Sequence, residues 1–170
     1  MEPALFRFEK QEVVRVEVRR PDDTLVLKET DAGWVLEESG FLASRSMVNR
    51  VKHQLHDLNA RATVIEATEA MALYGLGATA GHVRVELREG DPIEFLAGDP
   101  NPSSVSYYIK PIPGNRIYTV KKSAVDYYSF TLDEFRERRF ASFDSKDVEG
   151  IEADLPGGKR LVLQRLGDHL

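Results

Sequence analysis

Residues 8–30 read FEKQEVVRVEVRRPDDTLVLKET, and they decide how the sheet begins. From Val13 to Val18 apolar and charged side chains alternate, the pattern of a strand with one buried and one solvated face. Pro21 predicts a turn, because proline fixes φ and the two aspartates after it can bond nearby backbone amides. Leu25–Leu27 then predicts a second strand and Trp34–Leu36 a third. The stretch therefore predicts an antiparallel meander.

The end of the chain repeats this stretch. Residues 143–170 read FDSKDVEGIEADLPGGKRLVLQRLGDHL, and four of them repeat residues that lie 135 positions earlier, namely Phe143, Val148, Glu152 and Pro156. After one extra turn residue, Leu161–Leu163 matches Leu25–Leu27. We interpret this as a domain-sized tandem repeat, with a complete first copy over 1–139 and a truncated second copy, its opening β-hairpin, over 140–170. Alternatively, 140–170 is a native hairpin that completes the first sheet and hides an edge strand.

The segment between the hairpins predicts one long helix and a second meander. Apolar residues at helical spacing predict an amphipathic helix that packs on the sheet, capped by Ser44 or Ser46: Met47, Val48, Val51, Leu55 and Leu58. A short strand is expected over 62–65, then a brief helix capped by Thr68 and stopped by Gly75. Paired strands are expected over 82–87, 93–96, 105–110 and 116–120.

Two helices are expected next. Ser123 should cap a helix that carries Val125, Tyr127 and Tyr128. Thr131 and Glu134 have the spacing of a capping box, flanked by Phe130 and Phe135 at hydrophobic-staple positions, so a last helix is expected over 132–139. The predicted fold class is α+β, with two antiparallel β-meander blocks and helices packed on them.

Composition excludes several classes of site. The 170 residues are 42% hydrophobic and 30% charged, so a core and a solvated surface can both form. There is no cysteine, which excludes disulfides, zinc–thiolate sites and cysteine nucleophiles. The net charge of −5 and the lack of a long basic block argue against nucleic acid as a partner. No apolar run approaches the roughly 18 residues of a spanning helix.

Candidate chemistry is sparse, and no cofactor or metal is expected. Gly75, Gly77 and Gly81 resemble a nucleotide-binding fingerprint, but a helix precedes them and a strand follows, the reverse of what phosphate binding needs. They are therefore expected to be turn and cap glycines. His53 and His56 share a helix face with Asp57 nearby, but a third ligand is missing, so we expect exposed polar residues.

The remaining polar clusters are expected to be structural. Asp91 and Asp99 fall in predicted loops, where aspartate commonly supports turns. Lys121 with Lys122, and the run Arg136–Arg139, are expected to be solvated, the second through helix ion pairs with neighbouring glutamates.

Two tyrosines are the candidate interface. Adjacent residues of a strand face opposite sides, so one of Tyr107 and Tyr108 is expected to be exposed, and tyrosine is favoured at protein interfaces. The alternative is that each ring packs in the core with its hydroxyl in water. The pair Tyr127–Tyr128 leaves the same two alternatives open.

The ordered motifs resemble one family. They are the strand after Phe8 with its hairpin, Gly33–Trp34, Ala62–Val64, Ala72–Leu76, Gly98–Asp99 before Tyr107–Tyr108, Ile117–Val120 and Leu132–Arg139. Together they resemble the bacterial domain-of-unknown-function family numbered 4340. The resemblance implies tandem copies and an N-terminal membrane anchor in envelope proteins, some similar to auxiliary parts of gliding-motility or ABC-transporter systems. It implies no catalytic residues.

Two functions follow as expectations. The first is a non-catalytic protein-interaction or structural module of a bacterial envelope assembly, with a protein partner and no enzymatic activity. A full-length protein with the anchor would lie on the periplasmic side, whereas this chain itself is expected to be soluble. The second is a small-ligand-binding or enzymatic domain whose site forms between the two repeats.

Overall fold

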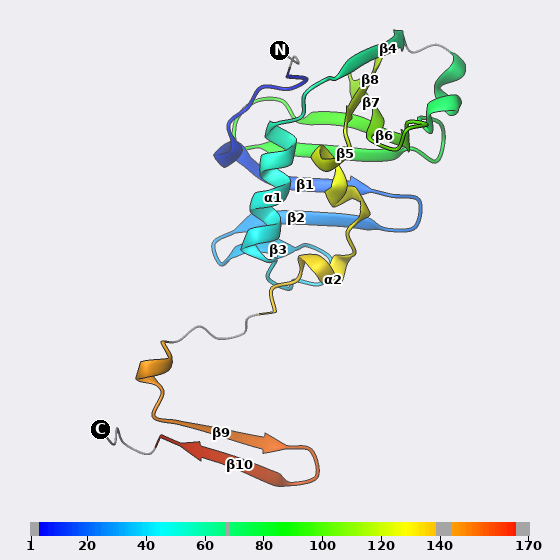
Figure 1. Ribbon diagram of the computed structural model, residues 1–170. Coiled ribbons are helices and arrows are strands. Elements are labelled where there is room, and N and C mark those ends of the chain that lie inside the picture. The colour runs from blue at the N-terminus through cyan, green and yellow to red at the C-terminus, as the bar shows by residue number, and fades with distance from the viewer. Residues whose placement is uncertain (1–3, 67–68, 139–143, 166–170) are drawn as a thin grey trace. The chain divides into compact units, whose positions relative to one another are not determined.

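The structure is a computed structural model that describes residues 4–66, 69–138 and 144–165. The chain divides into two compact units, Met1–Glu137 and Arg138–Leu170 (Figure 1). The expected boundary between residues 139 and 140 and the expected cap Thr68 lie outside the described residues.

Unit 1 is built on one eight-stranded antiparallel sheet in the order β3-β2-β1-β5-β6-β7-β8-β4. The strands are β1 Val13–Arg19, β2 Thr24–Thr30, β3 Gly33–Leu36, β4 Ala62–Glu66, β5 Gly81–Leu87, β6 Ile93–Pro100, β7 Ser106–Ile112 and β8 Arg116–Lys121. All the strands expected from alternation are therefore present. The α+β class with antiparallel meanders is confirmed.

The two expected meander blocks form a single sheet. β1 pairs antiparallel with β5, with Val16 opposite Val85 and Val18 opposite Val83. β4 does not pair with β3 or β5, its neighbours in sequence. It pairs with β8 and forms the edge of the sheet opposite β3. The first meander therefore covers one edge of the second, so β1 is a central strand with both of its edges paired.

Helix α1, Arg45–His56, lies across β1, β2 and β3 on one face of the sheet (Figure 1). Val48, Val51 and Leu55 are its buried residues, as the helical spacing predicted. They join one apolar core with the inward residues of the strands, among them Val16, Val18, Leu25, Leu27, Val83, Val85 and Phe95. Ser44 is the N-cap residue, but its side chain makes no cap hydrogen bond.

The segment after β8 is less helical than predicted. It forms two short 3-10 helices, η3 Lys122–Ala124 and η4 Asp126–Ser129. Lys121 is the N-cap residue of η3, so the prediction that Ser123 caps a continuous helix is wrong. Val125 separates the two helices because its backbone lies at φ −134°, outside the helical region.

The prediction of the last helix is confirmed for its first residue and is wrong for its last. Thr131 and Glu134 form the predicted capping box, and the Phe130 and Phe135 rings lie 6.1 Å apart between centroids. However, α2 spans only Leu132–Phe135. It ends because the backbone then pairs with another segment: Ala43 forms a bridge with Arg136, and Glu137 N donates to the Leu42 carbonyl.

The second face of the sheet carries charged side chains that pair across strands. Ion pairs link Arg15 to Glu17, Glu37 and Glu86, and Arg84 to Glu86 and Glu94. Glu17 is buried despite its charge, since Arg15 and Arg19 both contact its carboxylate. This face therefore accounts for the polar half of the alternation in β1 and β5.

Unit 2 contains one antiparallel hairpin, β9 Gly150–Leu155 and β10 Lys159–Gln164. Its pairing reproduces that of β1 and β2: Ile151 lies opposite Leu163 where Val16 lies opposite Leu27. The 3-10 helix η5, Ser145–Asp147, precedes it just as η1, Lys10–Glu12, precedes β1. The sequence correspondence thus extends to strand register.

Candidate functional site

The two candidate interface tyrosines lie on opposite faces of β7, and both are half-buried. Tyr107 packs against the main core. Tyr108 meets Tyr74 edge to face, with 4.8 Å between ring centroids. Tyr74 ends the 3-10 helix η2, Glu69–Tyr74. The expectation that one of the two is exposed is therefore wrong, and their role as an interface stays a prediction.

Tyr127 and Tyr128, the second tyrosine pair, differ in burial. Tyr127 is fully buried, and its hydroxyl has no hydrogen-bond partner among the residues that the structure describes. Burial raises the pKa of this phenol, so the group stays protonated. The Tyr128 ring is half-buried and covers Gly81. Tyr127 is therefore a core residue.

Gly75 and Gly81 allow neighbouring segments of the chain to pack closely. Gly75 has φ +68° and follows η2, and Gly81 opens β5, so a helix precedes and a strand follows, as predicted. A Cβ at Gly75 would overlap the side chain of Asp99, and one at Gly81 would overlap the Tyr128 ring. Both glycines therefore permit close approach of neighbouring segments.

The remaining polar candidates have structural contacts. Asp99 belongs to β6 and not to a loop as predicted, whereas Asp91 lies between β5 and β6. The Arg136 guanidinium lies 3.8 Å from the Phe41 ring centroid. Because α2 ends at Phe135, the helix that was predicted to carry Arg136–Arg138 does not extend over them, and Arg139 lies outside the described residues.

The histidine pair forms a small cluster with Asp57 at the end of α1. His56 Nδ1 lies 2.7 Å from Asp57 Oδ1, and His53 Nε2 lies 3.4 Å from Oδ2. The hydrogen bond from His56 holds the pKa of Asp57 below its usual range. Lys10 Nζ lies 2.6 Å from His53 Nδ1. Because an ammonium group can only donate, Nδ1 is the acceptor of this hydrogen bond, and the proton of the neutral imidazole ring is therefore on Nε2. Within the described residues, no group of three or more His, Asp or Glu side chains is placed to hold a metal ion.

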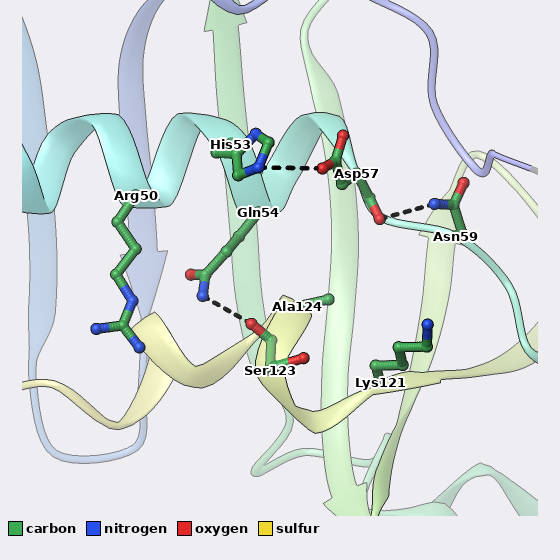
Figure 2. A pocket seen from close by; sticks show the side chains of 8 residues that line it. All are labelled: Arg50, His53, Gln54, Asp57, Asn59, Lys121, Ser123 and Ala124. Carbon is green, nitrogen blue, oxygen red and sulfur yellow. Dashed lines mark hydrogen bonds and ion pairs between the residues drawn. The ribbon is translucent and has the colours of Figure 1, made fainter.

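A polar pocket lies between α1 and the segment that follows β8 (Figure 2). Its volume is about 420 Å³, within the range of small-ligand sites. Eight residues line it: Arg50, His53, Gln54, Asp57, Asn59, Lys121, Ser123 and Ala124. Only Ala124 is apolar, so the pocket favours a polar ligand.

Gln54 is held rigidly in this pocket. Its Nε2 donates to the Ser123 carbonyl and to Asp126 Oδ1, both at 2.6 Å. Because both partners are acceptors, they fix which end of the amide is nitrogen. The Oε1 atom is buried and has no partner in the described residues. Leaving such an acceptor unpaired typically costs about 1–3 kcal/mol.

The charges around the pocket are balanced. Arg50 and Lys121 contribute two cations to its wall, and Arg50 also pairs with Asp126 beside it. Asp57 contributes one carboxylate. Sequence reasoning missed this pocket, because it combines residues about 70 positions apart that each look like ordinary solvated side chains.

The second notable surface is the hairpin of unit 2. Ile151, Leu155, Leu161 and Leu163 share one face by alternation and register, and they are 42–52% exposed. Glu152, Asp154 and Arg160 lie on the other face, where Arg160 pairs with both carboxylates. The hairpin is therefore amphipathic.

A family model described as a domain of unknown function (DUF4340) matches residues 34–170. The matched region includes β9 and β10. No curated protein and no solved structure matches. In the described part of the chain, no helix is both long and apolar enough to cross a membrane.

Proposed function

Because the chain belongs to the DUF4340 family, we propose that it is a non-catalytic protein-interaction module of a bacterial envelope-associated assembly. The surface that makes the contact is the apolar face of β9 and β10. An ABC-type transporter is the proposed kind of assembly. The resemblance to envelope proteins with tandem copies supports this location and this partner.

The observation that carries the proposal is a contrast in burial between matching positions. Val16, Leu25 and Leu27 in unit 1 are at most 1% exposed, whereas their counterparts Ile151, Leu161 and Leu163 are 47%, 42% and 52% exposed. Burial of one such side chain is worth about 1.5–3 kcal/mol. A two-stranded hairpin is only marginally stable alone in water. The hairpin therefore gains stability when another chain segment covers this face.

Unit 1 indicates what such a covering segment looks like. There the matching face is covered by α1 through Val48, Val51 and Leu55. The matching strands are flanked by β3 on one side and β5 on the other. We propose that the partner supplies a helix with a similar row of apolar side chains, and that this helix covers the apolar face of β9 and β10.

A matched pair of substitutions tests the contact surface. Leu163 and Val162 are adjacent and similarly exposed, at 52% and 48%, but they lie on opposite faces of the hairpin. Leu163→Asp should abolish co-purification of the partner from native cells, since it places a charge in the apolar contact. Val162→Asp should leave co-purification near the level of the unmodified protein.

Equal recovery of the partner by both variants would contradict the proposed surface. Equal loss would also contradict it, because the effect would then not depend on the face. Circular dichroism on both variants checks that unit 1 stays folded.

A further inference from the structure

We infer that the partner also adds a strand to the hairpin of unit 2, antiparallel to β9 along its outer edge, with a basic side chain opposite Glu152. The inference rests on the proposed function, because the same partner and the same hairpin are involved. The added strand supplies backbone hydrogen bonds, and its basic side chain supplies a charge that the hairpin lacks.

The outer edge of β9 presents backbone groups that are open to a further strand. The Arg165 backbone N–H donates to the Glu149 carbonyl, and hydrogen-bonded pairs alternate along an antiparallel ladder. The backbone groups of Ile151 and Ala153 therefore face β10, whereas those of Glu152 point away from it. Among the described strands, β9 pairs with β10 alone. Such an edge is a template for an extended segment of another chain.

The matching edge in unit 1 shows which strand fits. β1 matches β9, and the edge of β1 that faces away from β2 pairs antiparallel with β5. Val83–Val85 of β5 lies opposite Val16–Val18 of β1, so Arg84 lies opposite Glu17. Ile151–Ala153 of β9 matches Val16–Val18 at the same offset of 135 positions. The added strand is therefore expected to carry an apolar, a basic and an apolar residue in succession.

The charge of the added strand follows from the polar face of the hairpin. In β1, two arginines contact the Glu17 carboxylate. The two matching positions in β9 are Gly150 and Asp154, so β9 itself supplies no cation to Glu152. Within the two described strands, Arg160 is the one cation on this face, and it pairs with both carboxylates. A basic residue opposite Glu152 balances the remaining negative charge.

A synthetic peptide with the β5 sequence, GHVRVEL, is the probe. It is titrated at millimolar concentration into the isotope-labelled full chain and followed by NMR. The backbone amide signals of Gly150, Glu152 and Asp154 should shift, because their N–H groups point to the outer edge of β9. The amide signal of Val162, on the outer edge of β10, should shift less, since Arg160 on that strand repels the arginine of the peptide.

An exchange of charges tests the position of the basic residue. The peptide with Arg84→Glu should bind the chain about threefold more weakly than the parent peptide, because a cross-strand attraction becomes a repulsion. In the Glu152→Lys chain this order should reverse. Glu149→Lys makes the same change of charge just outside β9 and should keep the original order.

The added strand is overturned if the β5 peptide leaves the β9 amide signals in place, or if Glu152→Lys and Glu149→Lys act alike. Co-purification separates this failure from a failure of the proposed function. If Leu163→Asp still abolishes co-purification, the helix contact stands without the added strand. If Leu163→Asp has no effect, the proposed function itself fails.

Discussion

Ile151 lies directly opposite Leu163 across the β9–β10 hairpin, and both side chains are about half exposed. The same register in β1 and β2 places Val16 opposite Leu27, where both are buried under α1. One pattern of residues therefore occurs in two environments within one chain. The difference defines the face that a partner segment is proposed to cover.

The packing of Gly81 against Tyr128 gives a first stability prediction. A Cβ at Gly81 would overlap the Tyr128 ring, so Gly81→Ala should lower the free energy of unfolding by about 1–3 kcal/mol. Gly77→Ala is the control, because its Cβ would meet Ala72 at an ordinary 3.6 Å. Urea denaturation measures both, and similar losses would contradict the packing role of Gly81.

The buried hydroxyl of Tyr127 gives a prediction of opposite sign. Since this group has no hydrogen-bond partner in the described part of the chain, Tyr127→Phe should raise the free energy of unfolding by about 1 kcal/mol. Tyr128→Phe, at a half-buried position, should stay within about 0.5 kcal/mol of the parent. A clear destabilisation by Tyr127→Phe in thermal or urea unfolding would show that the hydroxyl is bonded.

The two helix caps differ in a way that can be measured. Thr131 accepts a hydrogen bond from the Glu134 backbone, so Thr131→Ala should cost about 1 kcal/mol. Ser44 occupies the N-cap of α1 without such a bond, so Ser44→Ala should cost less than about 0.5 kcal/mol. Equal costs in chemical denaturation would mean that capping bonds do not distinguish these positions.

The pairing of Glu17 predicts sensitivity to acid. Burial alone would raise the pKa of Glu17, but the bonds from Arg15 and Arg19 outweigh burial and lower it. A carboxyl with a lowered folded pKa stabilises the fold above its unfolded pKa, about 4.3, and loses that contribution as the pH falls toward the folded value. The free energy of unfolding should therefore fall as the pH drops below about 4.5.

Glu17→Gln tests this assignment. The variant should lose about 2 kcal/mol at neutral pH, since two charge-assisted bonds disappear, and should lose less than the parent on acidification. Urea midpoints at about pH 7 and pH 3 measure both effects. Parallel acid curves for variant and parent would show that Glu17 does not carry the pH dependence.

Much of the fold was predictable because alternation reports burial directly. The Val16–Val18 pattern predicted a strand, and the structure confirms the strand, but the prediction that its charged face is solvated is wrong at Glu17, which is also buried. The pairing of β1 with β5 could not be predicted, because alternation shows which side of a strand is buried and not which strand lies beside it. The helices were overestimated at Val125 and Arg136, where backbone geometry and tertiary pairing override local spacing.

The candidate sites could likewise be predicted only where they depend on residues close together in the sequence. The capping box was predictable because it depends on residues three positions apart. The pocket was not, since Gln54 and Ser123 meet only after α1 packs beside the end of β8. The exposure of Leu163 was likewise hidden, because its sequence context matches that of the buried Leu27.

The most direct test of the central claim is photocrosslinking in native cells from single positions on β10. A photoreactive phenylalanine analogue at Leu163 should capture a protein segment, because that side chain lies on the apolar face. The same analogue at Val162 should capture little, because it lies on the opposite face. Crosslinks of equal yield from both positions, or none from Leu163, would contradict the account.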